Sequence, residues 1–185
     1  MKFKSIVRSL LFISISITLS YNLFAKDKEL PYLRNGVSFS VAEGWSVIAN
    51  DSVGDNAYYF SAERNETNAT GLITITWVNK LEDPKKTIEM HQQTMKAANI
   101  YRNPGIEFAL IDKDNFAGQP SVSCRYTTIV KDQKLEGTIY CFNSAKKTIS
   151  IFIQTGLKDQ KINQKAFDLI RQTFNCREWS YNIFC

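Results

Sequence analysis

Among the residues of this 185-residue chain, the four cysteines are the best candidates for a specific chemistry, either disulfide formation or metal binding. They are Cys124, Cys141, Cys176 and Cys185. An even count in an exported protein favours disulfides over free thiols or metal ligands. Zinc is the rival interpretation, but the sequence has no Cys-x-x-Cys motif and its only histidine, His91, lies elsewhere. We predict two disulfides, Cys124–Cys141 and Cys176–Cys185, because each pair is locally reachable, and we predict no metal and no cofactor.

His91 is the one candidate for a catalytic base. Such a role would require a nucleophile and an orienting acid beside it, and nothing in the sequence places them. Acidic residues that could pair are of a kind common in loops: Glu89, Glu107, Asp112 and Asp114. Phosphate-binding glycine loops, Gly-x-Ser-x-Gly and His-Glu-x-x-His are also missing from the sequence. We expect a packing or surface role for His91, and we expect a protein that is not an enzyme.

Aromatic residues supply the candidate binding sites. The C-terminal segment 176–185 carries Arg177, Trp179, Tyr181 and Phe184. This segment is too short for a core of its own. It is either a disulfide-closed clasp over the sheet or an exposed aromatic patch of the kind enriched at protein interfaces. Tyr58 and Tyr59 could instead line a groove, and alternation places one of them in the core and the other at the surface.

The first 25 residues have the pattern of a secretory signal peptide that is cleaved after Ala25. They begin with basic residues and continue with an apolar run at 10–19. This run is short for a membrane span, which needs about 20 apolar residues, although an uncleaved anchor is the alternative. We therefore expect an exported protein, in the periplasm or outside the cell, with no transmembrane span in the mature chain.

Charge argues against a nucleic-acid partner. The leader contains three of the 23 basic residues and no acidic residue, so the mature chain carries 20 Lys and Arg against 18 Asp and Glu. An excess of two positive charges is too small to indicate binding to a phosphate backbone. The remaining 160 or so residues are enough for one core and one domain, 26–185.

The central element of the mature chain is a predicted β-hairpin over 121–143. If Asp132 and Gln133 form a two-residue loop, Cys124 lies opposite Cys141 at a separation that a disulfide tolerates. A longer loop that keeps the cysteine pair is the alternative, because Asp-Gln is not a favoured turn sequence. The alternation also predicts an inward face that contains both cysteines and a more polar opposite face.

Other elements follow from hydrophobic periodicity. Strands are expected over 37–41, 45–48, 57–61, 72–78, 106–111 and 148–154. Asp83 and Pro84 are typical of a helix start, and this helix extends to Asn99. A second helix over 159–174 presents one apolar face, made of Ile162, Ala166, Phe167, Ile170 and Phe174. Residues 26–35 are expected to be an extended segment, and 112–120 a turn-rich link.

Strands joined in hairpins rather than through crossover helices indicate an α+β fold, with an antiparallel β-sheet flanked by helices. Three stretches resemble one known family in particular: Gly-Val-Ser-Phe-Ser-Val-Ala-Glu-Gly-Trp at 36–45, Asn-Phe-Ala-Gly-Gln-Pro at 115–120, and Ala-Phe-Asp-Leu-Ile-Arg-Gln-Thr-Phe at 166–174. They are similar to the opening hairpin, the Gly-x-Pro turn and the C-terminal helix of the PsbP-like fold family. That family includes the extrinsic photosystem II subunit, a Ran-binding nuclear-import factor and DcrB-type envelope proteins.

The resemblance implies a function in binding or assembling other proteins, and none of the matching stretches is catalytic. We therefore expect an exported, non-enzymatic protein that binds or helps assemble a protein partner in the cell envelope or outside the cell. The alternative is a carrier that holds a small apolar ligand or lipid in a pocket between helix and sheet. The cysteine pair of the hairpin and the segment after Asn175 depart from the family pattern.

Overall fold

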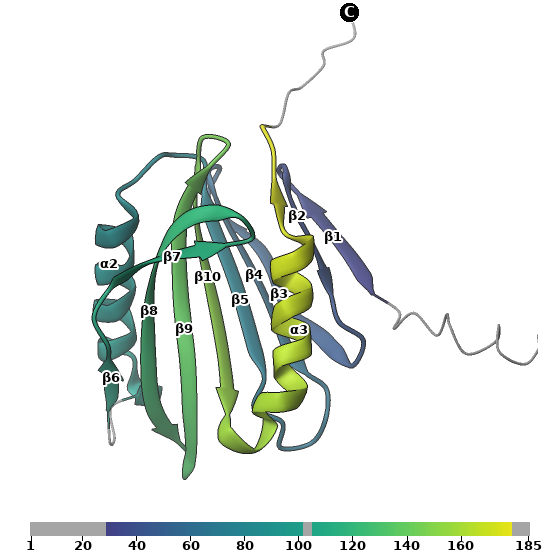
Figure 1. Cartoon of the computed structure of the whole chain (residues 1–185), viewed down its shortest axis with the longest axis vertical. Helices are drawn as coiled ribbons and strands as arrows, with labels where there is room; N and C mark the ends of the chain where they lie inside the picture. The colour runs from purple at the N-terminus through teal and green to yellow at the C-terminus, as the bar shows by residue number, and fades with distance from the viewer. Residues whose placement is uncertain (1–28, 102–104, 179–185) are drawn as a thin grey trace, which may run out of the picture.

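The computed structural model of the chain describes residues 29–101 and 105–178, which form two antiparallel sheets and two long helices (Figure 1). The large sheet has eight strands in the order β3-β4-β5-β10-β9-β8-β6, with β7 also paired to β8. Its strands are β3 (Trp45–Val53), β4 (Ala57–Arg64), β5 (Leu72–Val78), β6 (Ile106–Phe108), β7 (Asp112–Phe116), β8 (Gln119–Val130), β9 (Gln133–Ser144) and β10 (Lys147–Gly156). The small sheet consists of β1 (Leu30–Arg34), β2 (Val37–Val41) and β11 (Asn175–Cys176), with β2 in the centre.

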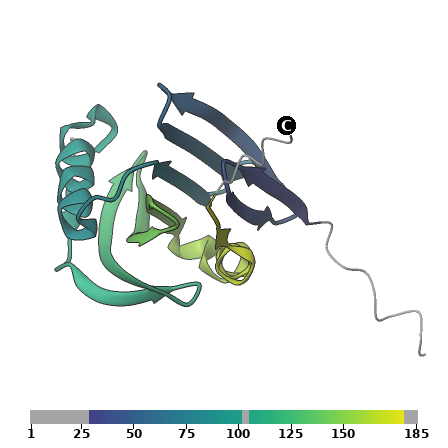
Figure 2. The same ribbon diagram turned by 90° about the horizontal axis from the view of Figure 1, so that it is seen from above.

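The two helices cover opposite faces of the large sheet (Figure 2). α2 (Pro84–Ala97) lies over β8 and β9, where Ile139 points toward it. α3 (Gln160–Thr173) and the small sheet lie on the other face, toward which Tyr140, the residue after Ile139, points. Two short 3-10 helices, η1 (Asn99–Tyr101) and η2 (Leu157–Asp159), complete the described elements. The predicted α+β class, with an antiparallel sheet and two helices in one domain, is confirmed.

The register of the central hairpin differs from the prediction by two residues. Val130 lies opposite Gln133, so the loop is Lys131-Asp132, and both residues have positive φ angles of 49° and 63°. Those angles match a two-residue turn whose twist follows that of the strands. Asp tolerates the left-handed region better than most residues, whereas the predicted loop would have placed Gln133 there.

The predicted Cys124–Cys141 disulfide is therefore wrong. Cys124 lies opposite Ile139 and Cys141 lies opposite Val122, so the two thiols are diagonal neighbours. Diagonal positions are about 7–8 Å apart, beyond the reach of a disulfide without movement of the backbone. Both thiols are free and buried, and a shift of two residues leaves them on the face that was predicted to be inward. The predicted Cys176–Cys185 disulfide is not formed either, since Cys176 is a free thiol; Cys185 itself lies outside the described residues.

Two further differences concern strands and one concerns a helix face. Residues 30–34 and 112–116 form β1 and β7, where an extended segment and a turn-rich link are expected. β7 shows no alternation because only Phe116 of its five residues is buried. On α3, Ile162 is 55% exposed and its neighbour Asn163 is fully buried, so the predicted apolar face is wrong at its first residue. The buried face of α3 otherwise contains the predicted Ala166, Phe167 and Ile170.

The start of α3 is anchored by a buried ion pair. Arg64 at the end of β4 places its guanidinium 3.2 Å from the Asp159 carboxylate, and both side chains are at most one-tenth exposed. Thr70 adds two hydrogen bonds to the same carboxylate, from its hydroxyl at 2.6 Å and its backbone N–H at 3.0 Å. Arg64 also donates to Oδ1 of Asn163 at 3.0 Å, which explains why an amide replaces an apolar residue there. Gly71 completes the site, since a Cβ atom would lie 2.7 Å from Asn163.

α2 is fixed by an N-terminal cap and by contacts with the sheet, and His91 is part of those contacts. The Asp83 side chain caps the helix by accepting from the backbone N–H groups of Lys85 and Lys86, as the sequence predicts. Nε2 of His91 lies 3.0 Å from Oγ of Ser150, and its ring meets Phe152 edge-on at 4.8 Å. Burial lowers the pKa of His91 below its ordinary value of 6.5, so the neutral ring is the form that packs.

We predict that Asp159→Asn lowers the free energy of unfolding by about 3 kcal/mol, because it removes the buried carboxylate that pairs with Arg64 and leaves that charge only the exposed Glu66. Urea unfolding at pH 7 measures this, with the exposed Asp55→Asn as control. Burial by itself raises the pKa of Asp159, but the Thr70 hydrogen bonds and the Arg64 charge outweigh it and hold the pKa below 3.8. The stabilisation is therefore complete above pH 3.8 and is lost as the pH falls through the lowered folded-state pKa.

A second prediction concerns the pH dependence of stability, which we attribute to His91, the single histidine of the sequence. Because the pKa of His91 is lower in the folded chain than in the unfolded chain, stability is complete above about pH 6.5 and decreases as the pH falls below it. The slope can reach about 1.4 kcal/mol per pH unit, since only the unfolded chain takes up the proton. Urea unfolding from pH 7.5 to 5 measures it, and His91→Gln is expected to flatten the curve. An unchanged slope in that variant would contradict this assignment.

Candidate functional site

The two tyrosines that the sequence singles out face opposite sides of the large sheet. The ring of Tyr58 stacks on Trp77, with the ring centroids 5.3 Å apart, on the face that also carries the small sheet. Tyr59 is paired with Thr76 and points to the other face. Both tyrosines are half-buried. They therefore do not line one groove together, and only Tyr58 lies beside the small sheet.

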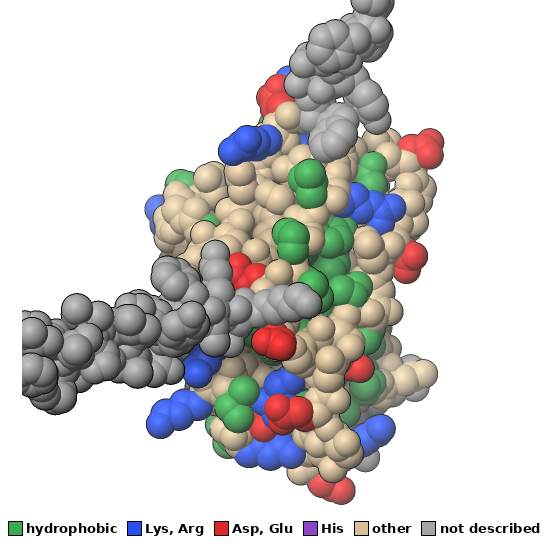
Figure 3. Space-filling view, turned by 90° about the vertical axis from the view of Figure 1, so that its right-hand side faces the viewer, with side chains coloured by type: hydrophobic (Ala, Val, Ile, Leu, Met, Phe, Trp, Pro, Cys, Tyr) green, Lys and Arg blue, Asp and Glu red, His purple; other side chains and the backbone are tan. Residues whose placement is uncertain are grey.

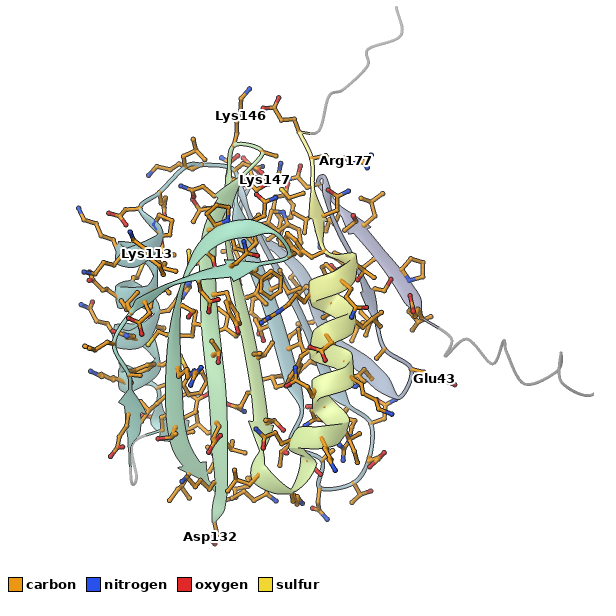
Figure 4. The ribbon with its side chains drawn as sticks, in the orientation of Figure 1. Glu43, Lys113, Asp132, Lys146, Lys147 and Arg177 are labelled. Atoms are coloured by element: carbon orange, nitrogen blue, oxygen red, sulfur yellow. The ribbon has the colours of Figure 1, made fainter. Side chains whose placement is uncertain are left out.

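Of the four candidates in the C-terminal segment, the structure describes only Arg177. Its backbone N–H donates to the Gly36 carbonyl at 2.9 Å, which extends the contact of β11 with the rest of the small sheet. Its side chain is exposed at the end of the molecule that also carries Lys146 and Lys147 (Figure 4). Lys146 forms an exposed ion pair with Glu178 at 3.4 Å. Trp179, Tyr181 and Phe184 lie outside the described residues.

The contact between His91 and Ser150 has the distance of a catalytic base and its nucleophile. Ser150 is only 3% exposed and the neighbouring Cys141 is fully buried, so a substrate would have no access to either group. Burial raises the pKa of Cys141 to about 11, despite hydrogen bonds from Ser150 and Thr87, so its thiol stays protonated. The contact therefore serves the packing of α2.

Metal binding finds no support in the part of the chain that the structure describes, since no three His, Cys, Asp or Glu side chains are grouped there to hold an ion. Among residues 29–101 and 105–178, no helix is long and apolar enough to span a bilayer. The features that remain are a surface formed by two edge strands and a groove beside α3.

The edge strands of the two sheets lie on the same side of the molecule and carry exposed apolar residues. β3 is the edge of the large sheet and β1 is the edge of the small one. We call this region the edge surface, and it consists of Leu30, Leu33, Val47, Ile48 and Val53, which are 48–69% exposed. Figure 3 shows hydrophobic side chains gathering along this side of the molecule.

Specific contacts hold β1 next to β3. The Tyr32 hydroxyl donates to Oδ1 of Asn50 at 2.8 Å, and Arg34 donates to the backbone carbonyl of Asn50 at 3.0 Å. The Arg34 guanidinium also lies over the Tyr58 ring, 5.3 Å from its centroid. Tyr32 itself packs against Phe60 of β4, with centroids 4.7 Å apart. The apolar residues of the edge surface are therefore displayed on a fixed scaffold, and Tyr58 borders it.

The opposite edge of the large sheet is formed by shorter strands. β6 has three residues and β7 has five, and together they pair along β8 at that edge. β3 has nine residues and is interrupted only by a bulge near Ile48. An edge strand of that length exposes unpaired backbone groups that can accept another strand. Sequence reasoning missed this, because an expected strand over 45–48 does not reveal which strand is left without a neighbour.

The groove lies between α3 and strands β8, β9 and β10, with a volume of about 520 Å³. Most of its lining is polar, and it includes Arg125, Glu136, Thr138, Gln164 and Arg171. A lipid or other apolar ligand requires a mainly apolar lining. The lining therefore does not favour the carrier alternative in its apolar form.

No protein-family model matches the sequence, and no curated protein is significantly similar to it. Solved structures are similar in fold. CyanoP, the cyanobacterial PsbP of Synechocystis sp. PCC 6803, superposes with a TM-score of 0.55 at 13% identity, over 84% of this chain and 95% of CyanoP. LpqN of Mycobacterium tuberculosis, described as involved in cell envelope biogenesis, superposes with a TM-score of 0.51 at 12% identity, over 88% and 96%.

A third superposition is looser: the Ran-binding protein Mog1p of Saccharomyces cerevisiae has a TM-score of 0.46 at 10% identity, over 82% of this chain and 95% of Mog1p. The first two superpositions cover most of this chain and nearly all of the other molecule. Identities this low establish the fold and nothing finer. The chain therefore has the PsbP-like fold that its sequence resembles.

Proposed function

We propose that this is an exported, non-enzymatic protein that binds a protein partner in the cell envelope or outside the cell, and that the edge surface is its binding site. The observation that carries the proposal is the set of exposed apolar residues on β1 and β3. Several exposed large apolar residues on two neighbouring edge strands are typical of a surface that meets a partner. The expected N-terminal signal peptide supplies the argument for export.

The geometry of the edge surface favours a partner that approaches along the strands. The backbone groups on the free edge of β3 can pair with an added strand, while Val47 and Ile48 supply apolar side-chain contacts. Leu33 on β1 widens the apolar area beside that edge. The likeness in fold to LpqN, whose description places it in cell envelope biogenesis, is consistent with a role of this kind.

The alternatives have less support. A lipid carrier would require an apolar cavity, and the groove beside α3 has a mainly polar lining. A second hollow on the other side of α3, of about 570 Å³, has apolar lining residues such as Trp45 and Ile162, but charged residues including Arg64 and Lys165 also line it. An enzyme would require an accessible nucleophile or base, and Ser150, the partner of His91, is buried in the sheet beneath α2. A nucleic-acid partner is disfavoured by the small positive charge of the mature chain.

The proposal predicts a position-specific crosslink in the cells that produce the protein. A photoreactive amino acid in place of Ile48 is expected to give a discrete adduct with one partner, because Ile48 lies in the middle of the edge surface. The same amino acid in place of Leu157, which is 54% exposed on η2, is the matched control and is expected to give none. Mass spectrometry of the adduct identifies the partner.

Binding of the purified partner then tests the surface quantitatively. Leu33→Asp or Ile48→Asp is expected to weaken it about tenfold or more, since a charge replaces an apolar side chain at the centre of the interface. Leu157→Asp is expected to leave it unchanged. Equal binding by all three variants, each with an unaltered unfolding midpoint, would refute the assignment of the edge surface.

A further inference from the structure

The groove beside α3 is separate from the edge surface and shares no residue with it. Its floor is the face of β9 and β10 that carries Thr138, Tyr140 and Ile153. One wall is β8 and the other is α3, where Phe167 and Gln164 face the sheet. The β7–β8 hairpin bends toward α3 at one end of the groove (Figure 1). A volume of about 520 Å³ is within the range of small-ligand sites.

Arg171 of α3 is held in place at that end of the groove. Its guanidinium lies over two rings, 5.4 Å from the centroid of Phe116 and 5.3 Å from that of Tyr140. It also donates a hydrogen bond to the Tyr140 hydroxyl at 2.8 Å. A guanidinium has five N–H donors in a fixed plane, and stacking on aromatic rings limits its rotation before any ligand binds. Most of its donors remain available to the groove.

A second arginine lies on the opposite wall. Arg125 of β8 is paired with Thr138, which is two residues from Tyr140 on the same face of β9. The two arginines therefore line the groove from opposite walls, near Thr138 and Tyr140 of its floor. None of the ion pairs found among the described residues involves Arg125 or Arg171, and both side chains are exposed.

The net charge of the groove lining limits which anions the two arginines can bind. Glu136 is the one acidic residue in the lining, next along the same face of β9 after Thr138. With Arg125 and Arg171 it gives the lining a formal charge of +1. Threonine hydroxyl and glutamine amide groups occupy half of the other positions: Thr127, Thr138, Thr155, Gln160 and Gln164. This set suits an anion with a single charge and a polar body better than a phosphate with two charges or an apolar chain.

We propose that this groove binds a monocarboxylate, with Arg171 and Arg125 holding the carboxylate and Gln164 and Thr138 contacting the polar body beside it. A planar guanidinium forms two parallel hydrogen bonds with a carboxylate, which provides direction as well as charge. The carboxylate is that of a small polar acid or that of the C-terminus of a peptide. Both sources present the same group to Arg171.

The test is NMR titration of the isotope-labelled mature protein with four probes: sodium lactate, N-acetyl tripeptides with free C-termini, the same peptides as C-terminal amides, and inorganic phosphate. We expect lactate or the free-acid peptides to shift the Arg171 side-chain N–H signal and the backbone amides of Thr138 and Gln164. Stronger shifts with lactate identify a small acid, and stronger shifts with the peptides identify a C-terminus. The peptide amides are expected to cause no shift at these positions.

Substitutions locate the site. Arg171→Gln is expected to weaken binding about tenfold or more, because a charge-assisted hydrogen bond is lost. Since Arg171 also packs on two rings, Arg125→Gln provides a second variant whose exposed side chain is not needed for packing, and Lys161→Gln on the outer side of α3 is the control. The proposal is overturned if neither carboxylate shifts these signals at ~10 mM, if the amides bind equally well, or if phosphate binds more tightly.

Discussion

The interaction on which the rest of the structure depends is the buried contact between Arg64 and Asp159. It joins the end of β4 and the loop that follows it to the start of α3, which lies far along the chain. A buried charge is costly unless it is paired and hydrogen-bonded, so both side chains are confined to one arrangement. Because α3 contacts both β2 and β10, fixing its start also fixes how the small sheet lies on the large one.

That arrangement determines both surfaces to which we assign binding. The small sheet, held under α3 and by the contacts of Tyr32 and Arg34 with Asn50, places β1 beside the free edge of β3. On the other side of α3, the same helix forms the wall of the polar groove and brings Arg171 over Phe116 and Tyr140. One helix position therefore produces an apolar surface and a charged groove on the same face of the large sheet.

The two surfaces differ in chemistry, which bears on the family resemblance. The edge surface is apolar and offers unpaired backbone groups, as suits an extended protein partner. The groove is polar and carries two arginines without carboxylate partners among the described residues, as suits a small anion. The fold shared with CyanoP and LpqN does not predict either surface, because fold similarity at 12–13% identity carries no information on side chains.

Local sequence pattern by itself determined most strands of the large sheet, the two helices, the Asp83 cap and the inward face of the hairpin, since these depend on neighbours close in sequence, but it missed β1, β7 and β11. Tertiary structure alone decided the register of Cys124 and Cys141, the burial of Asn163 and the exposure of Ile162. Alternation has a period of two residues, so a shift of two residues leaves every side chain on its predicted face while changing every cross-strand partner. Free edges, buried polar groups and the two-walled groove depend in the same way on partners that are distant in the chain, and local patterns do not encode them.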